Sequence, residues 1–250
     1  MVVAVIPARY ASTRFPGKPL VDIWGKSMLQ RVWERVCMAT SVKRVVIATD
    51  DERIYEHARS FGAEVIMTRA DHRSGTDRCA EAVAGIEAAD IVLNIQGDEP
   101  FVQPDQINLL VRTLREEPEC PIATLVKRIC DQEELFSPNV VKAVFSERRR
   151  ALYFSRHPIP FVRGAAPETW LAKTVFYKHI GMYAFRRSVL LQLAQLPDSP
   201  LEQAESLEQL RWLAHGYDLA VGITEQESIS IDTPEDLQRL LATLKPADTF

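Results

Sequence analysis

Three cations within residues 9–18 are the first side chains that could do chemistry, and the chemistry that they favour is phosphate binding. Arg9, Arg14 and Lys18 share one loop with the hydroxyls of Ser12 and Thr13, and no acidic residue interrupts it before residue 22. Arginine supplies paired planar donors, lysine a compact charge, and hydroxyls fill the remaining directions around phosphate oxygens. Composition alone favours an ordinary exposed basic loop. The loop directly follows the first predicted strand, residues 2–6, and alternating strand–helix chains bind ligands at such strand ends, which favours a binding loop.

Two aspartates form the second candidate site. Asp98 follows the apolar segment 91–95, and Asp232 precedes a Thr-Pro-Glu-Asp sequence. Thr233 is predicted to cap a helix, Pro234 to take its first position and Asp236 to complete a capping box, which leaves Asp232 without a structural role. These aspartates could merely neutralise the basic loop. Two separated carboxylates at strand ends also suit a magnesium ion that carries phosphates.

The segment 69–78 has two interpretations that the residues alone leave open. Ser74 or Thr76 is a good helix cap, which would be a purely structural role. Alternatively, Gly75 lets the backbone approach a nucleobase and Arg78 points at an anion, since a helix start favours negative charge.

Other polar groups have simpler interpretations. Asp50 and Asp51 precede a predicted helix, 51–60, and are interpreted as helix-start residues. Glu208 and Gln209 are either solvent-facing or available to sugar hydroxyls. His179 lies in a predicted strand, where a core histidine is the default.

The elements that must position these groups alternate along the first half of the chain. Short apolar runs predict five strands. The helix over 28–36 and the helix from Pro104 each carry apolar residues on one face, and Pro104 takes the first helical position. Continuously apolar strands that alternate with helices predict a Rossmann-like, mostly parallel α/β sheet covered by helices on both faces. The predicted strands are residues 2–6, 45–48, 63–67, 91–95 and 122–126.

The pattern changes after about residue 137. A hairpin is predicted over 140–145 and 151–154, with Arg148, Arg149 and Arg150 in an exposed turn rather than a nucleic-acid patch. Then follow a strand over 177–185, helices over 188–195 and 201–215, a strand over 219–223 and a last helix from Pro234. We therefore predict one domain over 1–250, with an antiparallel insertion at about 137–187.

Composition excludes several classes of protein. The chain has 250 residues, 46% of them apolar, and a net charge of −4, so neither a nucleic-acid nor an anionic-lipid surface is indicated. Its apolar runs are strand-sized and no basic leader precedes a cleavable segment, so no membrane insertion and a cytosolic location are expected. Its four cysteines form no Cys-x-x-Cys pair, so neither a disulfide framework nor a zinc site is predicted.

Taken together, these segments resemble the 3-deoxy-manno-octulosonate cytidylyltransferase (CMP-Kdo synthetase) family nearly end to end. The basic loop alone is typical of sugar nucleotidyltransferases, and the Tyr-Phe-Ser-Arg, Leu-Glu-Gln-Leu-Arg and Asp-Thr-Pro-Glu-Asp segments narrow the likeness to the Kdo enzymes. The residues that carry the resemblance are 6–14, 16–20, 68–72, 74–76, 96–100, 151–156, 200–202, 207–211 and 232–236. Residues 157–174 match the family pattern poorly, and 226–230 lack its usual glycine-rich run.

The resemblance implies a fold of the nucleotide-diphospho-sugar transferase type and transfer of CMP from CTP to Kdo, with release of pyrophosphate, for lipopolysaccharide assembly. It also implies a cytoplasmic, magnesium-dependent homodimer. Carried onto matching positions, it implies catalytic roles for Arg9, Lys18, Asp98 and Asp232, the two aspartates holding the metal. It places Arg9, Ser12, Thr13, Arg14 and Lys18 on the triphosphate, Arg73, Ser74 and Gly75 near the base, and Arg78, Gln96, Arg156, His179, Tyr183, Glu208 and Gln209 around Kdo.

Three alternative functions remain at this point. A CMP synthetase for another acidic sugar, such as 8-amino-Kdo or sialic acid, would share most of these residues. A metal-dependent glycosyltransferase usually carries an Asp-x-Asp pair, whereas Asp98 is followed by Glu99 and Pro100. A nucleotide sensor without catalysis would bind CTP but not turn it over. A dehydrogenase is excluded, because no Gly-x-Gly-x-x-Gly follows the first strand.

Overall fold

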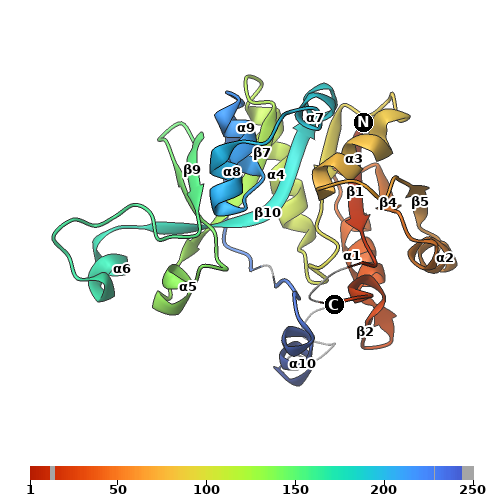
Figure 1. The fold of residues 1–250 in the computed structure, drawn as a ribbon, viewed down its shortest axis with the longest axis horizontal. Coiled ribbons are helices and arrows are strands. Elements are labelled where there is room, and N and C mark those ends of the chain that lie inside the picture. Colours follow the sequence, from red (N-terminus) through yellow and green to blue (C-terminus); the bar gives the residue numbers. More distant parts are fainter. Residues whose placement is uncertain (12–14, 228, 244–250) are drawn as a thin grey trace. The chain divides into compact units, whose positions relative to one another are not determined.

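The computed structural model describes residues 1–11, 15–227 and 229–243, which group into two compact units. Unit 1 comprises Met1–Asn108 and Ser228–Phe250, and unit 2 comprises Leu109–Glu227. The predicted insertion at about 137–187 falls inside unit 2. Figure 1 shows a mixed α/β fold of strands and helices, which confirms the predicted fold class.

Unit 1 is built on four parallel strands in the order β6-β1-β4-β5. Four consecutive residues of β1, from Val3 to Ile6, have no solvent exposure, as expected for a parallel strand covered on both faces. All four strands match predicted segments to within two residues at each end. They are β1 (Val2–Ala8), β4 (Arg44–Thr49), β5 (Glu64–Met67) and β6 (Ile91–Asn94).

Helices connect these strands, and their starts follow from capping side chains. The hydroxyl of Ser27 accepts a hydrogen bond from the Gln30 amide at the start of α1, and the Asp51 carboxylate accepts one from the Arg53 amide at the start of α2. The helices of unit 1 are α1 (Met28–Cys37), α2 (Glu52–Ser60), α3 (Gly75–Ala84) and α10 (Pro234–Thr243). A short hairpin, β2 (Asp22–Ile23) with β3 (Lys26–Ser27), precedes α1.

Unit 2 is a mixed sheet. Strand β7 pairs in parallel with β11 and antiparallel with β10, while β8 pairs antiparallel with both β9 and β10. The β8–β9 hairpin confirms the predicted one, and Arg148 and Arg149 in its turn are exposed. The strands are β7 (Ile122–Ile129), β8 (Lys142–Phe145), β9 (Ala151–Ser155), β10 (Phe176–Arg186) and β11 (Leu219–Thr224).

One predicted helix of unit 2 is wrong. Residues 201–215 form two short helices instead of one, because Ser206 adopts a left-handed conformation with φ of 52° that ends the first. The Ser199 hydroxyl and the Glu202 carboxylate make a capping box at its start. The helices of this part of the chain are α4 (Pro104–Glu116), α5 (Gln132–Phe136), α6 (Trp170–Lys173), α7 (Arg187–Leu193), α8 (Pro200–Glu205) and α9 (Gln209–Ala214).

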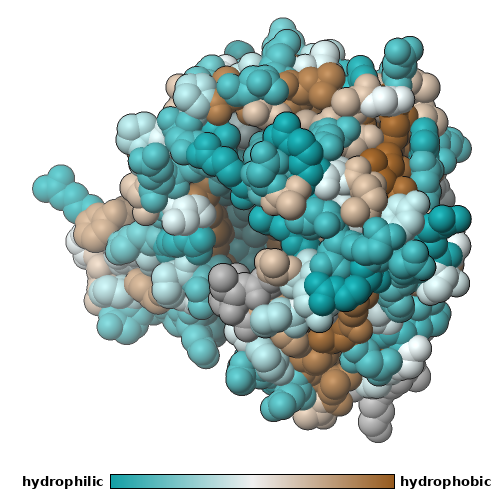
Figure 2. All heavy atoms as spheres, turned by 45° about the vertical axis from the view of Figure 1, so that its right-hand side comes forward, coloured by the Kyte–Doolittle hydropathy of each residue, from teal (hydrophilic) through white to brown (hydrophobic). Residues whose placement is uncertain are grey.

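Across residues 1–11, 15–227 and 229–243 the structure contains no helix whose length and hydropathy would let it span a membrane. The face shown in Figure 2 is mostly hydrophilic, with hydrophobic side chains in separate patches.

Candidate functional site

The candidate site of unit 1 begins where β1 and β6 end side by side. These strands run parallel, and the amide of Ile95 donates to the Val5 carbonyl at 3.1 Å, which extends their pairing beyond β6. The carboxyl ends of parallel neighbours meet at one edge of the sheet, where open α/β sheets bind ligands. Arg9 therefore leaves β1 at the same edge where Gln96, Gly97 and Asp98 leave β6.

Gly97 allows these two strand ends to approach closely. A Cβ atom at this position would lie 3.0 Å from the backbone oxygen of Pro7 and 3.6 Å from the Ile6 side chain. Backbone oxygen cannot move aside as a flexible side chain can. Because Gly97 has no side chain, its backbone can pack against the end of β1, which places Asp98 next to that strand end.

We expect Gly97→Ala to lower the free energy of unfolding by about 1–3 kcal/mol, the usual cost of inserting a methyl group into a packed region. The measurement is urea denaturation of the purified variant. Gly85→Ala is the matched control, since an added Cβ there meets no atom within 4 Å, and it should change stability by less than about 0.5 kcal/mol. Equal stability of both variants would contradict the close approach.

A sharp turn at Gly17 positions Lys18 at the site. Gly17 has φ of 72°, a left-handed conformation that strains other residues, and its amide donates to the Tyr10 carbonyl at 3.0 Å. The 3-10 helix η1 (Lys18–Leu20) starts directly afterwards and fixes the backbone of Lys18. The remaining predicted loop residues, Ser12, Thr13 and Arg14, lie outside the described residues.

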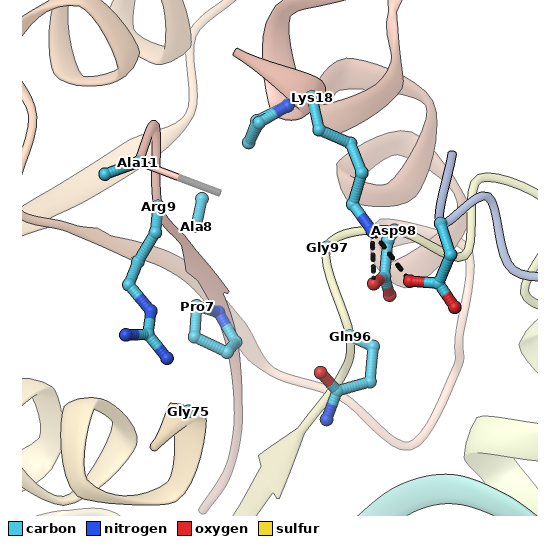
Figure 3. A pocket seen from close by; sticks show the side chains of 11 residues that line it. Pro7, Ala8, Arg9, Ala11, Lys18, Gly75, Gln96, Gly97 and Asp98 are labelled. Atoms are coloured by element: carbon cyan, nitrogen blue, oxygen red, sulfur yellow. Dashed lines mark hydrogen bonds and ion pairs between the residues drawn. The ribbon is translucent and has the colours of Figure 1, made fainter. Parts of the chain in front are cut away.

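The Lys18 ammonium brings the two predicted aspartates together. Its Nζ lies 2.7 Å from a carboxylate oxygen of Asp98 and 3.3 Å from one of Asp232, the dashed contacts of Figure 3. The two acids are far apart in the sequence, yet both point at one cation. The two carboxylates and the basic loop at residues 9–18 thus contribute to one site within unit 1.

Asp232 is available to Lys18 because other side chains cap α10. The Asp236 carboxylate accepts from the amides of Asp232 and Thr233 at 3.1 and 2.9 Å, and the Asp236 amide donates to the Thr233 hydroxyl at 3.2 Å. This arrangement confirms the predicted capping box and leaves the Asp232 side chain outside it. The amide of Ile231 also donates to the Asp98 carbonyl at 3.0 Å, which ties the two acidic segments together.

These groups face a cavity of about 450 Å³, within the usual size range of small-molecule sites. Arg9 and Lys18 supply positive charge to it, and Asp98 and Asp232 supply negative charge. The view in Figure 3 looks into this cavity. It is lined by Pro7, Ala8, Arg9, Ala11, Lys18, Pro19, Gly75, Gln96, Gly97, Asp98 and Asp232.

The donor set of the cavity fits magnesium. Asp98 and Asp232 are hard oxygen donors, and their oxygens already converge on one cation, the Lys18 ammonium. Within the described ranges, no cluster of three or more His, Cys, Asp or Glu side chains has metal-binding geometry. Two carboxylates, with phosphates and waters to complete the shell, are what magnesium sites in nucleotide enzymes commonly provide.

The loop before α3 contains the predicted helix cap, while its predicted role near a nucleobase stays a prediction. Ser74 is the helix cap, since its hydroxyl accepts from the Asp77 amide at 3.1 Å, and the structural interpretation of Ser74 is confirmed. Gly75, the next residue, lines the cavity. Arg73 is exposed in the preceding loop, and the Arg9 guanidinium donates to the His72 carbonyl at 3.3 Å, which joins this loop to the basic one.

Arg78 lies in the core of unit 1 rather than in the cavity lining. Its side chain has no solvent exposure, and its guanidinium contacts the Thr68 hydroxyl at 2.5 Å and the Asp50 carboxylate at 3.3 Å. Asp50 is therefore the partner of a buried arginine, and Asp51 alone caps α2 as predicted. A sugar-binding role for Arg78 stays a prediction, because its observed contacts are with protein groups.

Three of the predicted sugar residues gather inside unit 2. The ring of His179 lies 5.4 Å from the ring of Tyr183, and the Glu208 carboxylate is near the Tyr183 hydroxyl. Burial, and to a smaller degree this carboxylate, raises the pKa of Tyr183 well above its usual value. Gln209, at the start of α9, is 3% exposed.

His179 is held as a neutral ring. Its Nε2 lies 2.8 Å from the Thr124 hydroxyl, and the Phe154 ring lies 4.9 Å away. Burial lowers the pKa of His179 to about 3, because the enclosed site disfavours the charged imidazolium. The default interpretation of His179 as a histidine satisfied by protein contacts fits this environment.

Acidification should therefore destabilise the fold through His179. Its pKa is near 6.5 when unfolded and about 3 when folded, so the unfolded chain binds more protons as pH falls below about 6.5. Going from pH 7 to pH 5.5 should cost at most about 1 kcal/mol, since the residue keeps some contact with water. Urea denaturation at both pH values should show a smaller loss in His179→Gln than in the wild type. The control His215→Gln should keep the wild-type loss, and an unchanged pH dependence in His179→Gln would contradict the assignment.

Arg156 is held by two residues that sequence reasoning missed. The Glu205 carboxylate accepts from the Ser155 hydroxyl at 2.6 Å and from the Arg156 amide at 2.9 Å, and its backbone oxygen accepts from Arg156 Nε at 2.7 Å. The fully buried Lys142 donates to the Arg156 carbonyl. Burial lowers the pKa of Lys142 to about 8. No sequence signal joins Glu205 to Arg156, since the two are 49 residues apart.

Comparisons with known proteins show the family to which the chain is related. The family model described as "Cytidylyltransferase" matches residues 3–226. A 3-deoxy-manno-octulosonate cytidylyltransferase of Parabacteroides distasonis is 53% identical over 247 residues, with 97% of each chain covered. A protein of the same name from Porphyromonas gingivalis is 51% identical over 248 residues, covering 98% of this chain and 96% of the relative.

Solved structures extend the likeness to three dimensions. A structure described as CMP:2-keto-3-deoxy-manno-octonic acid synthetase complexed with CTP has a TM-score of 0.90 and 45% identity, covering 96% of this chain and 97% of that one. A 4-diphosphocytidyl-2C-methyl-D-erythritol synthase from Anaerococcus prevotii, with a TM-score of 0.64 and 13% identity, shares the fold alone. By its sequence and its structure, this chain belongs to the cytidylyltransferase family, among the 3-deoxy-manno-octulosonate cytidylyltransferases.

Proposed function

We propose that the protein transfers CMP from CTP to 3-deoxy-D-manno-octulosonate (Kdo), forming CMP-Kdo and releasing pyrophosphate. Relatives that are about 50% identical to this chain over nearly their whole length are named for this activity. The structural neighbour with a TM-score of 0.90 was solved with CTP. The observation in this chain that carries the proposal is the cavity of unit 1, where two cations and two carboxylates meet at the carboxyl edge of a parallel sheet.

Each part of the cavity has a role in this reaction. Arg9 and Lys18 bind the triphosphate and offset its charge, with Lys18 on the leaving phosphates. Gly75 gives the nucleotide base close access to the backbone. Asp98 and Asp232 would hold magnesium, which when bound neutralises phosphate charge and favours the ionised form of the attacking hydroxyl.

The chemistry is an in-line displacement at the α-phosphorus by the anomeric hydroxyl of Kdo. Both substrates are anions, so the protein must hold them together against their repulsion and keep the hydroxyl aligned with the phosphorus. Gln96, which lines the cavity of unit 1, is proposed to bind the sugar. Sugar-binding roles for Arg156, His179, Tyr183, Glu208 and Gln209 stay predictions that rest on the family resemblance. No side chain is assigned as general base.

A panel of acidic sugars tests the proposal. Purified protein is incubated with CTP, Mg²⁺ and either Kdo, 8-amino-Kdo or sialic acid, and pyrophosphate release is measured. We expect the fastest release with Kdo. Faster release with another sugar would reassign the acceptor, and CTP binding without turnover on any sugar would reject the activity.

The location, the pathway and the oligomeric state of the enzyme are also proposals. The family resemblance supports a cytoplasmic enzyme of lipopolysaccharide assembly that acts as a homodimer. Light scattering of the purified protein measures its mass in solution; twice the mass of one 28.3 kDa chain supports the dimer, and one chain mass rejects it.

A further inference from the structure

The Lys18 ammonium is bound by the same two carboxylates that are proposed to bind the metal. Its Nζ lies within ion-pair distance of both, at 2.7 Å from Asp98 and 3.3 Å from Asp232. The Lys18 side chain is 14% exposed, whereas the two carboxylates are 28% and 40% exposed. The lysine is thus well enclosed, while both carboxylates keep more of their surface exposed and line the cavity.

A divalent ion on these carboxylates would compete with the ammonium. Magnesium binds carboxylate oxygens at about 2.0–2.1 Å, so an ion shared by Asp98 and Asp232 would lie close to the position of Nζ. Two positive charges at such a distance repel each other strongly in a partly enclosed site. The two carboxylates can therefore bind either the Lys18 ammonium or the metal, but not both at once.

The ammonium has somewhere else to go when a triphosphate is present. The backbone of Lys18 is fixed in η1 by the Gly17 turn, but its four-carbon side chain rotates freely enough to redirect the charge. The side chain faces the same cavity in which the phosphates are proposed to bind. A phosphate oxygen can replace a carboxylate oxygen as its partner.

We propose that Lys18 competes with the divalent cation for Asp98 and Asp232, and that the nucleotide relieves this competition by drawing the ammonium to its phosphates. The proposal rests on the proposed function and adds an order of binding: the metal at these carboxylates binds with the nucleotide and not before it. Lys18 thereby couples metal affinity to the presence of the triphosphate.

Manganese binding, measured by the loss of the free Mn²⁺ electron paramagnetic resonance signal, tests the competition without any turnover. Lys18→Met keeps the length of the side chain and removes its charge. Without nucleotide, we expect Lys18→Met to bind Mn²⁺ at least tenfold more tightly than the wild type. With saturating α,β-methylene-CTP the wild type should bind Mn²⁺ at least tenfold more tightly than without it, and the advantage of the variant should largely disappear.

Two further variants serve as controls. Lys26→Met removes another ion-paired lysine of the same unit, held by Glu34 at 2.7 and 2.8 Å, and should leave Mn²⁺ affinity at the wild-type value. Adding Asp232→Asn to Lys18→Met should abolish the gain, which assigns the bound ion to these carboxylates. Circular dichroism of each variant establishes that it is folded.

Either of two results overturns the proposal: equal Mn²⁺ affinity of the wild type and Lys18→Met without nucleotide, or equal affinity of the wild type with and without the CTP analogue. Failure of the proposed function is seen separately, as a lack of pyrophosphate release by the wild type with CTP and Kdo. A protein that shows the Mn²⁺ exchange but no turnover would keep the coupling and lose the activity.

Discussion

Replacing Asp98 by asparagine should lower the turnover number by about 10² to 10³, the usual cost of removing one well-placed charge stabiliser. The amide keeps the size of the side chain and an oxygen to accept from Lys18, which lies 2.7 Å from the carboxylate. It lacks the negative charge with which the carboxylate would hold a magnesium ion. The measurement is pyrophosphate release at saturating CTP, Kdo and Mg²⁺.

The fold should survive this change, because Lys18 retains its contact with Asp232. Asp105→Asn is the matched control: this aspartate is exposed in the first turn of α4 and should show wild-type turnover. Near-normal turnover of folded Asp98→Asn would remove Asp98 from the metal site.

Asp232→Asn should lower turnover by a similar factor, about 10² or more, for the same electrostatic reason. Because Asp236 caps α10 through the amides of Asp232 and Thr233, the helix start does not depend on the Asp232 side chain. A loss of activity with an unchanged unfolding midpoint is therefore expected. Turnover and urea denaturation of the same preparation measure both quantities.

Glu235→Gln, an exposed neutralisation three residues further on, is the control and should behave like the wild type. The double variant Asp98→Asn/Asp232→Asn carries a further expectation. Since both acids are proposed to hold one ion, the combined loss should be smaller than the product of the single losses. Strictly multiplicative losses would show that the two carboxylates act independently.

Much of unit 1 was predictable from sequence because its signals are local. A continuously apolar run buried on both faces predicts a parallel strand, and the predicted segments match β1, β4, β5 and β6. The capping box at Thr233 and Asp236 was predictable for the same reason, since both partners lie within one helical turn. The resemblance to the Kdo cytidylyltransferases was likewise readable from short motifs.

The break between α8 and α9 was not predictable from periodicity. Apolar spacing continues through residues 201–215, and the left-handed conformation of Ser206 interrupts the helix without a glycine or proline to signal it. The different roles of Asp50 and Asp51 were also not predictable. Asp51 caps the neighbouring helix, whereas the partner of Asp50 is Arg78, which lies far from it in the sequence.

The sequence by itself determined the strands, the helix caps and the types of group available for chemistry, because hydrophobic periodicity and capping act over a few residues. Only the tertiary structure decided which of those groups meet. It placed Arg78 on Asp50 in the core, bound Arg156 to Glu205, and brought Asp98 and Asp232 to one Lys18 ammonium. Such pairings join residues distant in the chain, and they depend on where each strand ends in the sheet, which no local pattern specifies.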